Sequence, residues 1–180
     1  KSKGINGEFI RLPRDGADEL TALQRALIAD LDRFRRYALG LTADLAHADD
    51  LVQSACEQAL RGKAPARPEE LAPWMFRVMR NRWIDEQRRS KRWLTEPLDG
   101  AVGDELASPL AGPEQPIHLE QLLTALGALA PPLRLTLTLI SIEGLSYREA
   151  AEQMDVPIGT VMSRLSRARK ALGRKLEDGL

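Results

Sequence analysis

Apolar residues recur along this chain at three- and four-residue steps, with almost none of the alternation that a strand would need. The first such stretch, from Leu20 to Leu41, predicts a long amphipathic helix, because residues at these steps share one helical face. The same pattern predicts a second helix from about Ala48 through Leu60 and a third from near Pro73 to Arg92. We therefore expect an all-α protein.

The predicted third helix divides its residues between two sides. We expect its inward side to hold Trp74, Met75, Val78, Met79 and Trp83. The outward side is then crowded by polar residues, namely Arg77, Arg80, Asn81, Asp85, Arg88 and Arg89. In the predicted second helix, Asp49 and Asp50 fall in the first turn, where carboxylates interact favourably with the helix dipole.

The segment Leu133–Ser141 has a pattern that fits two kinds of element. Thr136 and Thr138 alternate with leucines, as they would in a strand. The preceding Pro131 and Pro132 favour a helix start, because the first helical turn does not need the N–H group that proline lacks. The neighbouring segments are also predicted to be helical, so we expect a helix here.

Near the C-terminal end, local signals predict two consecutive helices joined by a tight turn. Ser146 and Glu149 stand three residues apart and predict a capping box for a helix over Tyr147–Met154. Asp155 follows as the turn residue, because Asp tolerates the left-handed backbone conformation better than most residues. Pro157 then suits the first turn of the second helix.

The second of these helices has an apolar side and a basic side. We expect a buried stripe made of Ile158, Val161, Leu165, Ala168 and Leu172. The opposite side carries Met162, Ser163, Ser166, Arg167 and Lys170. Six basic residues and no acidic residue lie between Ile158 and Leu176. This combination is typical of a helix-turn-helix whose second helix enters the major groove of DNA, and a solvated face in an ordinary helical bundle is the alternative.

Residues 94–116 contain several prolines and glycines among Asp, Glu and Ala, with no sustained periodicity. Such a stretch is uncommon inside one compact domain, so it predicts an acidic flexible linker between two small helical domains, at residues 10–93 and 117–180. An acidic solubility spacer is the alternative. Residues 1–9 lack an initiator Met and resemble a vector-derived tail.

The net charge of zero is the sum of opposed blocks. Residues 43–60 hold four acidic residues and no Lys or Arg, and residues 93–120 hold six acidic residues and no basic one. Residues 74–92, in contrast, hold seven basic residues against two acidic ones. Segregation of this kind predicts separate surfaces with separate partners.

The sequence shows no arrangement of residues that catalysis or metal binding would require. A single cysteine, Cys56, excludes an internal disulfide and a cysteine-cluster zinc site. His47 and His118 have no metal-like or catalytic neighbours, and we interpret both as surface or helix-end residues. We predict no enzymatic activity, no metal and no cofactor. The apolar runs are also too short and too often interrupted by charge for membrane insertion.

Three stretches of the chain resemble extracytoplasmic-function sigma factors, the smallest bacterial initiation factors. The resemblance to their promoter-reading domain lies in EGLSYREAAEQMDVPIGTVMSRLSRARKAL. ADDLVQSACEQAL resembles the polymerase-binding helix of their first domain, and WMFRVMRNRWIDEQRR resembles their −10-element helix. Together these matches cover roughly Leu20 to Leu176. WMFRVMRN and VPIGTVMSRL also resemble the general-stress branch of the family.

The resemblance implies a sigma factor that reads two promoter elements and promotes DNA melting in the cytoplasm. The positions that contact the −35 element in the family match Met162, Ser163, Ser166 and Arg167 here, with Arg164, Arg169 and Lys170 as phosphate contacts. The main position that contacts the melted −10 element in the family matches Asn81, and its neighbours match Arg77, Arg80, Asp85 and Arg88. Its polymerase-docking positions match Asp49, Asp50 and Gln53. The implied partners are core RNA polymerase (the β′ clamp and the β flap), promoter DNA and an anti-sigma factor.

Two other functions fit the same helix-turn-helix. An ordinary repressor or activator would need neither the polymerase-binding helix nor the −10 helix. A sigma-mimicking adaptor would bind an anti-sigma factor instead of DNA and would not need the basic faces. For a sigma factor we expect weak, unspecific binding of the free chain to duplex DNA, because the linker leaves the separation of the two domains undefined and its acidic residues compete with DNA.

Overall fold

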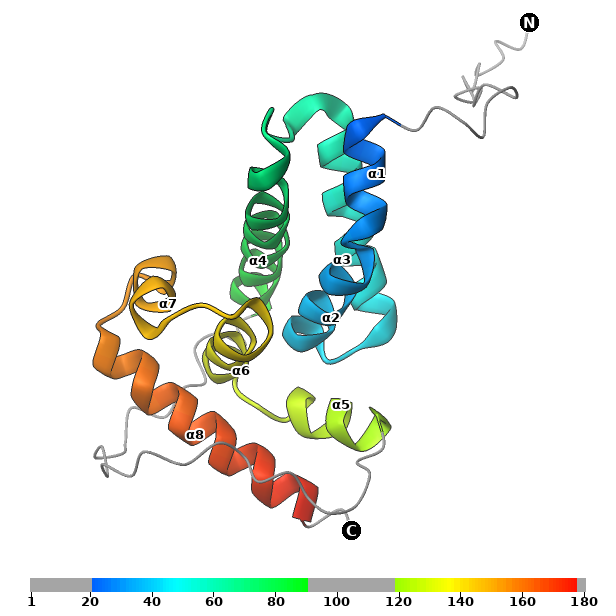
Figure 1. Cartoon of the computed structure of the whole chain (residues 1–180). Coiled ribbons are helices and arrows are strands. Elements are labelled where there is room, and N and C mark those ends of the chain that lie inside the picture. The colour runs from blue at the N-terminus through cyan, green and yellow to red at the C-terminus, as the bar shows by residue number, and fades with distance from the viewer. Residues whose placement is uncertain (1–20, 91–118, 178–180) are drawn as a thin grey trace, which may run out of the picture.

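The structure is a computed structural model that describes residues 21–90 and 119–177, and every regular element within these ranges is helical. The N-terminal half contains α1 (Ala22–Ala29), α2 (Leu31–Thr42), α3 (Leu45–Gln58) and α4 (Leu71–Arg89). The C-terminal half contains α5 (Leu119–Gly127), α6 (Pro131–Thr138), α7 (Tyr147–Met154) and α8 (Ile158–Glu177). Figure 1 shows α6 between the N-terminal helices and α8. The all-α prediction is confirmed.

The predicted helix from Leu20 to Leu41 is two helices in the structure, because the chain bends at Asp30 between α1 and α2. Asp30 has φ −99° and ψ 5°, which lies outside the α-helical region. The apolar spacing continues across the bend, from Leu27 to Phe34, so periodicity alone does not reveal it. Aspartate has a low helix propensity, which makes it a residue at which such a bend costs little.

The start of α3 differs from the prediction by three residues. Asp44 caps this helix, since its Oδ1 accepts a hydrogen bond from the His47 backbone N–H at 2.7 Å. The preceding Ala43 ends α2 in the left-handed conformation, with φ 55°. As a result Asp49 and Asp50 lie in the second turn of α3, and their interpretation as first-turn residues is wrong.

Aromatic and sulfur-containing side chains form the core of the N-terminal half. Met75, Met79 and Trp83 of α4 are fully buried, as predicted, whereas Trp74 and Val78 are only partly buried. The Phe76 ring contacts two rings of α2, with centroid distances of 5.7 Å to Phe34 and 4.6 Å to Tyr37. Helix α4 therefore packs on α2 through Phe76, and it also contacts α3.

The ambiguous segment Leu133–Ser141 is helical, as predicted, through α6 and the π-turn Leu139–Glu143 that follows it. Proline occupies the start of α6. Thr136 and Thr138 are accommodated because each hydroxyl donates a hydrogen bond to the carbonyl oxygen four residues earlier, at 2.8 and 3.0 Å. Both threonines are buried, so this bonding satisfies groups that have no access to water.

The local signals of the helix-turn-helix are confirmed. The Ser146 hydroxyl accepts from the Glu149 backbone N–H at 3.3 Å, and the Glu149 carboxylate accepts from the Ser146 backbone N–H at 2.8 Å. The Ser146 hydroxyl also donates to the Glu149 carboxylate, at 2.7 Å, and this bond together with the one from the Ser146 backbone N–H lowers the pKa of Glu149. Asp155 is left-handed, with φ 52°, and α8 begins directly after Pro157.

One hydrophobic cluster extends across both halves of the molecule. It contains Phe34, Met79 and Trp83 from the N-terminal half together with Leu135 and Val161 from the C-terminal half. The expectation that the two domains have an undefined separation is therefore wrong for this structure, because apolar side chains of α6 and α8 complete the core. The linker at 94–116, the tail at 1–9 and His118 lie outside the described residues.

Candidate nucleic-acid interface

Helix α8 presents the predicted basic side outward and buries its apolar stripe. Val161, Leu165, Ala168 and Leu172 are at most 6% exposed. Ile158 is 48% exposed, and its assignment to the buried stripe is wrong. It is the first residue of α8, directly after the turn.

The residues predicted to read the −35 element lie on the outward side of α8. Met162 is 40% exposed, Lys170 is exposed, and the others are half-buried, namely Ser163, Arg164, Ser166, Arg167 and Arg169. Arg167 lies back along the helix, with its Nε donating to the Ser163 carbonyl oxygen at 3.4 Å. The Ser163 hydroxyl donates to the Thr160 carbonyl oxygen at 3.0 Å.

The residues predicted to contact the −10 element lie on α4, and four of the five are exposed, namely Arg77, Asn81, Asp85 and Arg88. Arg80 is only 7% exposed, so its placement on the outward side is wrong. Its guanidinium donates a hydrogen bond to the side-chain oxygen of Gln153 in α7. The C-terminal half covers this position, which the spacing of residues within α4 cannot reveal.

Asn81 lies on a ridge between two hollows. The first, of about 440 Å³, lies between α4 and the helix-turn-helix, and its walls include Asn81, Asp85, Arg88, Asp155 and Arg164. The second, of about 450 Å³, lies between α3 and α4, and its walls include Gln58, Asn81, Arg82, Glu86 and Arg89. Asn81 can therefore be reached from both sides of α4.

The predicted polymerase-docking residues Asp49, Asp50 and Gln53 are all exposed on α3. Asp49 forms an ion pair with Arg35 at 3.4 Å, and the two side chains are 65% and 55% exposed. Since α3 is capped by Asp44, neither Asp49 nor Asp50 is needed to complete the helix end. Two carboxylates with no capping role lie together on this surface.

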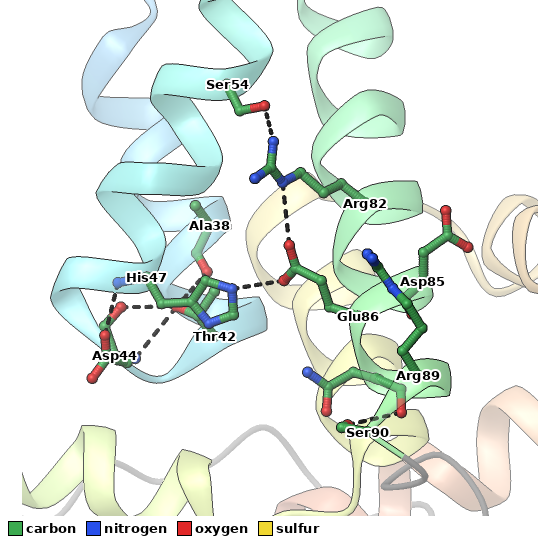
Figure 2. A network of polar contacts seen from close by, with 11 residues as sticks. Ala38, Thr42, Asp44, His47, Ser54, Arg82, Asp85, Glu86, Arg89 and Ser90 are labelled. Atoms are coloured by element: carbon green, nitrogen blue, oxygen red, sulfur yellow. Dashed lines mark hydrogen bonds and ion pairs between the residues drawn. The ribbon is translucent and has the colours of Figure 1, made fainter.

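A polar network that the sequence did not predict joins α3 to α4 (Figure 2). The His47 ring is 2.7 Å from a carboxylate oxygen of Glu86, and Arg82 Nε donates to the other oxygen at 3.2 Å. Arg82 also donates to the Ser54 hydroxyl. The four-residue spacing of Arg82 and Glu86 indicates an ion pair on one helix face, whereas the contacts to His47 and Ser54 depend on the packing of two helices.

Other kinds of site have no support within residues 21–90 and 119–177. No group of three His, Cys, Asp or Glu side chains there lies close enough to hold a metal ion. Cys56 is half-buried, and burial raises the pKa of its thiol, which favours the unreactive protonated form. No helix in these ranges is long and apolar enough to cross a membrane.

Comparison with known proteins assigns both halves of this chain to one family. The family description "Sigma-70 region 2" matches residues 27–93, and "Sigma-70, region 4" matches residues 119–172. These ranges hold α4 and most of α8, with their exposed polar faces.

Whole-chain relatives agree with this assignment. The ECF RNA polymerase sigma factor EcfG of Rhodopseudomonas palustris (strain TIE-1) is 32% identical over 158 residues, covering 86% of this chain and 85% of that protein. The ECF RNA polymerase sigma factor SigM of Bacillus subtilis (strain 168) is 30% identical over 138 residues, covering 76% and 84%. The sigma factor RpoE of Bartonella quintana, solved with the anti-sigma factor NepR, superposes with a TM-score of 0.60 at 26% identity, covering 88% and 98%. The chain therefore belongs to the extracytoplasmic-function (ECF) family of RNA polymerase sigma factors, which recognise promoters.

Proposed function

We propose that this sigma factor reads the −35 element with α8 and the melted −10 element with α4, while α3 docks on core polymerase. The composition of the outward side of α8 is the observation that supports the proposal most strongly. It displays basic and small polar residues over a fully buried apolar stripe, and no acidic residue occurs between Ile158 and Leu176. An unbroken cationic face on a rigid helix is suited to the major groove.

On α8 we assign base reading to Met162, Ser163, Ser166 and Arg167. Arg167 is suited to guanine, because a guanidinium can bond both acceptors of that base in the major groove. Arg164, Arg169 and Lys170 are assigned to phosphates, which position the domain without specifying sequence. The helix-turn-helix half is also assigned to the β flap of core polymerase.

On α4 we assign contact with the melted strand to Asn81, supported by Arg77, Asp85 and Arg88. Taking a base out of the stack costs a few kcal/mol, which polar contacts must offset. The hollows on either side of Asn81 are lined by hydrogen-bonding side chains, with two arginines and two acidic residues in each. Arg80 joins this set only when the C-terminal half does not cover it.

On α3 we assign docking on the β′ clamp to Asp49, Asp50 and Gln53. All three are exposed, and the carboxylates have no capping role that would explain them. Exposed carboxylates can pair with arginines on a partner surface. The polar network of His47, Ser54, Arg82 and Glu86 ties this docking helix to the −10 helix, so that one element can position the other.

We further propose that the chain acts in the cytoplasm, where RNA polymerase works, has no catalytic activity of its own, and serves a general stress response. The general-stress assignment is supported by the WMFRVMRN and VPIGTVMSRL stretches. An anti-sigma factor is proposed as a further partner, since the Bartonella quintana relative was solved with one.

Run-off transcription with purified core polymerase on a promoter library tests the proposed function. We expect transcripts only from templates that share two sequence elements, one near −35 and one near −10. A chain that binds promoter duplex tightly but yields no transcript with core polymerase would be an ordinary regulator, and the assignments to α3 and α4 would be withdrawn.

A further inference from the structure

Two large apolar side chains are exposed at the start of α8. Ile158 is 48% exposed and Met162 is 40% exposed. They stand four residues apart, so they are neighbours on the surface of the helix. No charged residue of α8 precedes Arg164, so the helix begins with apolar and small polar residues only. The start of α8 therefore differs in chemistry from the basic surface that follows it.

Gly159 keeps the surface beside Ile158 open. A Cβ atom added at Gly159 would meet nothing within 4 Å, so packing does not require glycine at this position. The glycines with positive φ within residues 21–90 and 119–177 are Gly62 and Gly144, so backbone conformation does not require glycine at position 159 either. Glycine is a poor helix former and weakens the first turn of α8. Such a residue is expected where something outside the chain approaches the helix closely.

The row of side chains that begins with Ile158 and Met162 continues at four-residue steps through Ser166 to Lys170. In helix-turn-helix proteins the N-terminal residues of the second helix are the ones that reach base edges. In the major groove the apolar group on a base edge is the C5-methyl group of thymine. Cytosine instead presents an amino donor, which an apolar side chain leaves unpaired. An apolar pair at this end of α8 is therefore suited to thymine and unsuited to cytosine.

We propose that Ile158 and Met162 read thymine methyl groups in the −35 element. The inference rests on the proposed assignment of α8 to that element, adds Ile158 to the residues that determine specificity, and names the group that Met162 contacts. Along the helix axis the two residues are about 6 Å apart, at about 1.5 Å per residue. This separation is about two steps of duplex at 3.4 Å per step. The two side chains can therefore contact methyl groups on different base pairs.

The two side chains differ in stiffness, which suits them to different parts of this task. Isoleucine branches at Cβ and has one strongly preferred χ1 rotamer in a helix. Methionine is unbranched and adapts its shape to irregular surroundings. Ile158 is therefore suited to read one fixed position, and Met162 to follow small shifts of a neighbouring one.

The test removes single methyl groups from the DNA. Deoxyuridine replaces thymine at one −35 position at a time, in a promoter duplex taken from the run-off library, and the affinity of the full chain bound to core polymerase is measured for each duplex. For the parent chain we expect a loss of about 4-fold at one or two positions, which is the factor that one buried methyl group contributes. Ile158→Ala and Met162→Ala should each bind the thymine duplex about 4-fold more weakly. Each variant should also lose the sensitivity to deoxyuridine at one of these positions.

The matched control is Ile28→Ala in α1, which truncates a 59% exposed isoleucine of the N-terminal half. It should keep the sensitivity to deoxyuridine at every position. Circular dichroism verifies that each variant is folded. The deoxyuridine scan of the parent chain needs no variant, so the proposal can be refuted even if a substitution unfolds the protein.

Equal affinity of the parent chain for all thymine and deoxyuridine duplexes would overturn the proposal, as would a −35 element without A·T pairs. Sensitivity that survives in both Ile158→Ala and Met162→Ala would also overturn it, because the methyl groups would then act through another residue or through DNA shape. In each of these cases a preference for promoter duplex over scrambled duplex leaves the assignment of α8 intact. Without that preference, the assignment of α8 is refuted and the inference with it.

Discussion

Helices α4 and α8 have similar sequence patterns but different surroundings. In α8 the apolar stripe is buried from Val161 onward, with only Ile158 exposed, and the polar residues opposite it face outward, as the spacing predicts. In α4 two polar residues, Arg80 and Gln87, are also buried, at 7% and 6% exposure. Helix α8 packs on other helices through one side, whereas α4 has α2 and α3 on one side and the C-terminal half on another. Spacing assigns faces correctly only when a helix has neighbours on a single side.

The largest expected effect compares one core residue from each helix. Trp83→Ala should lower the free energy of unfolding by about 3 to 5 kcal/mol, because it leaves a large cavity where both halves meet. Leu172→Ala should cost about 2 kcal/mol, at the low end for leucine, because Leu172 lies near the end of α8 in the smaller cluster. Urea denaturation of both variants measures the difference. Equal losses, despite the larger side chain removed at Trp83, would mean that the core is packed less tightly where the two halves meet than at the end of α8.

The next effect concerns α3, whose docking residues no other part of the described chain covers. Changing Asp49 and Asp50 to Lys should weaken binding to core polymerase by at least about 30-fold, since removing one partner of an interfacial charge pair costs about 2 to 5 kcal/mol. The loss of the exposed Asp49–Arg35 ion pair should cost the fold less than about 1 kcal/mol. A pull-down with core polymerase measures the binding, and circular dichroism verifies the fold.

A matched control for this change exists at the other end of the N-terminal half. Glu69 and Glu70 are also adjacent, exposed and acidic, and they precede α4. Their change to Lys alters the net charge equally and should leave polymerase binding intact. If both double variants lose binding to the same extent, the effect reflects overall charge, and Asp49 and Asp50 have no specific docking role.

Features that depend on a few consecutive residues could be predicted from the sequence. The capping box of Ser146 and Glu149 and the left-handed Asp155 are examples, because their hydrogen bonds and backbone angles are local. The cap at Asp44 is equally local, so the start of α3 at Leu45, three residues before the predicted Ala48, can also be derived from a few consecutive residues. Asn81, Met162 and Lys170 were placed correctly at the surface for a related reason, since helical spacing fixes them relative to the stripe.

Features that depend on the packing of distant segments could not be predicted. The bond from Arg80 to Gln153 joins residues 73 positions apart in sequence. Gly40 gave no signal of its purpose, because the atoms that exclude a side chain there belong to Thr138 and Ile142. His47 likewise looked like an isolated surface residue until α3 and α4 placed it against Glu86. Each of these contacts forms only when distant helices pack together, so the sequence alone does not indicate it.

A smaller effect is expected at the exposed ridge of α4. Asn81→Ala should impair opening at −10 by about 2 kcal/mol, because it removes hydrogen bonds that offset the cost of extracting a base. Binding to the −35 element should not change, since α8 reads it separately. Permanganate footprinting of the polymerase complex measures the opening. Gln58→Ala, which alters the opposite wall of the hollow between α3 and α4, is the control and should open DNA normally.

The smallest effect is expected on α8 and separates base reading from phosphate binding. Arg167→Ala should weaken promoter use at the lower end of about 1 to 3 kcal/mol, because its Nε is already bonded to Ser163 and fewer donors remain for a base. It should also relax sequence preference at one or two −35 positions. Lys170→Ala, on the same face and exposed, should weaken binding equally on all sequences and reduce the salt slope by about 1. Run-off transcription on a −35 library at several salt concentrations distinguishes the two patterns. If Arg167→Ala weakened transcription equally on all −35 sequences, Arg167 would be a phosphate contact and would not read a base.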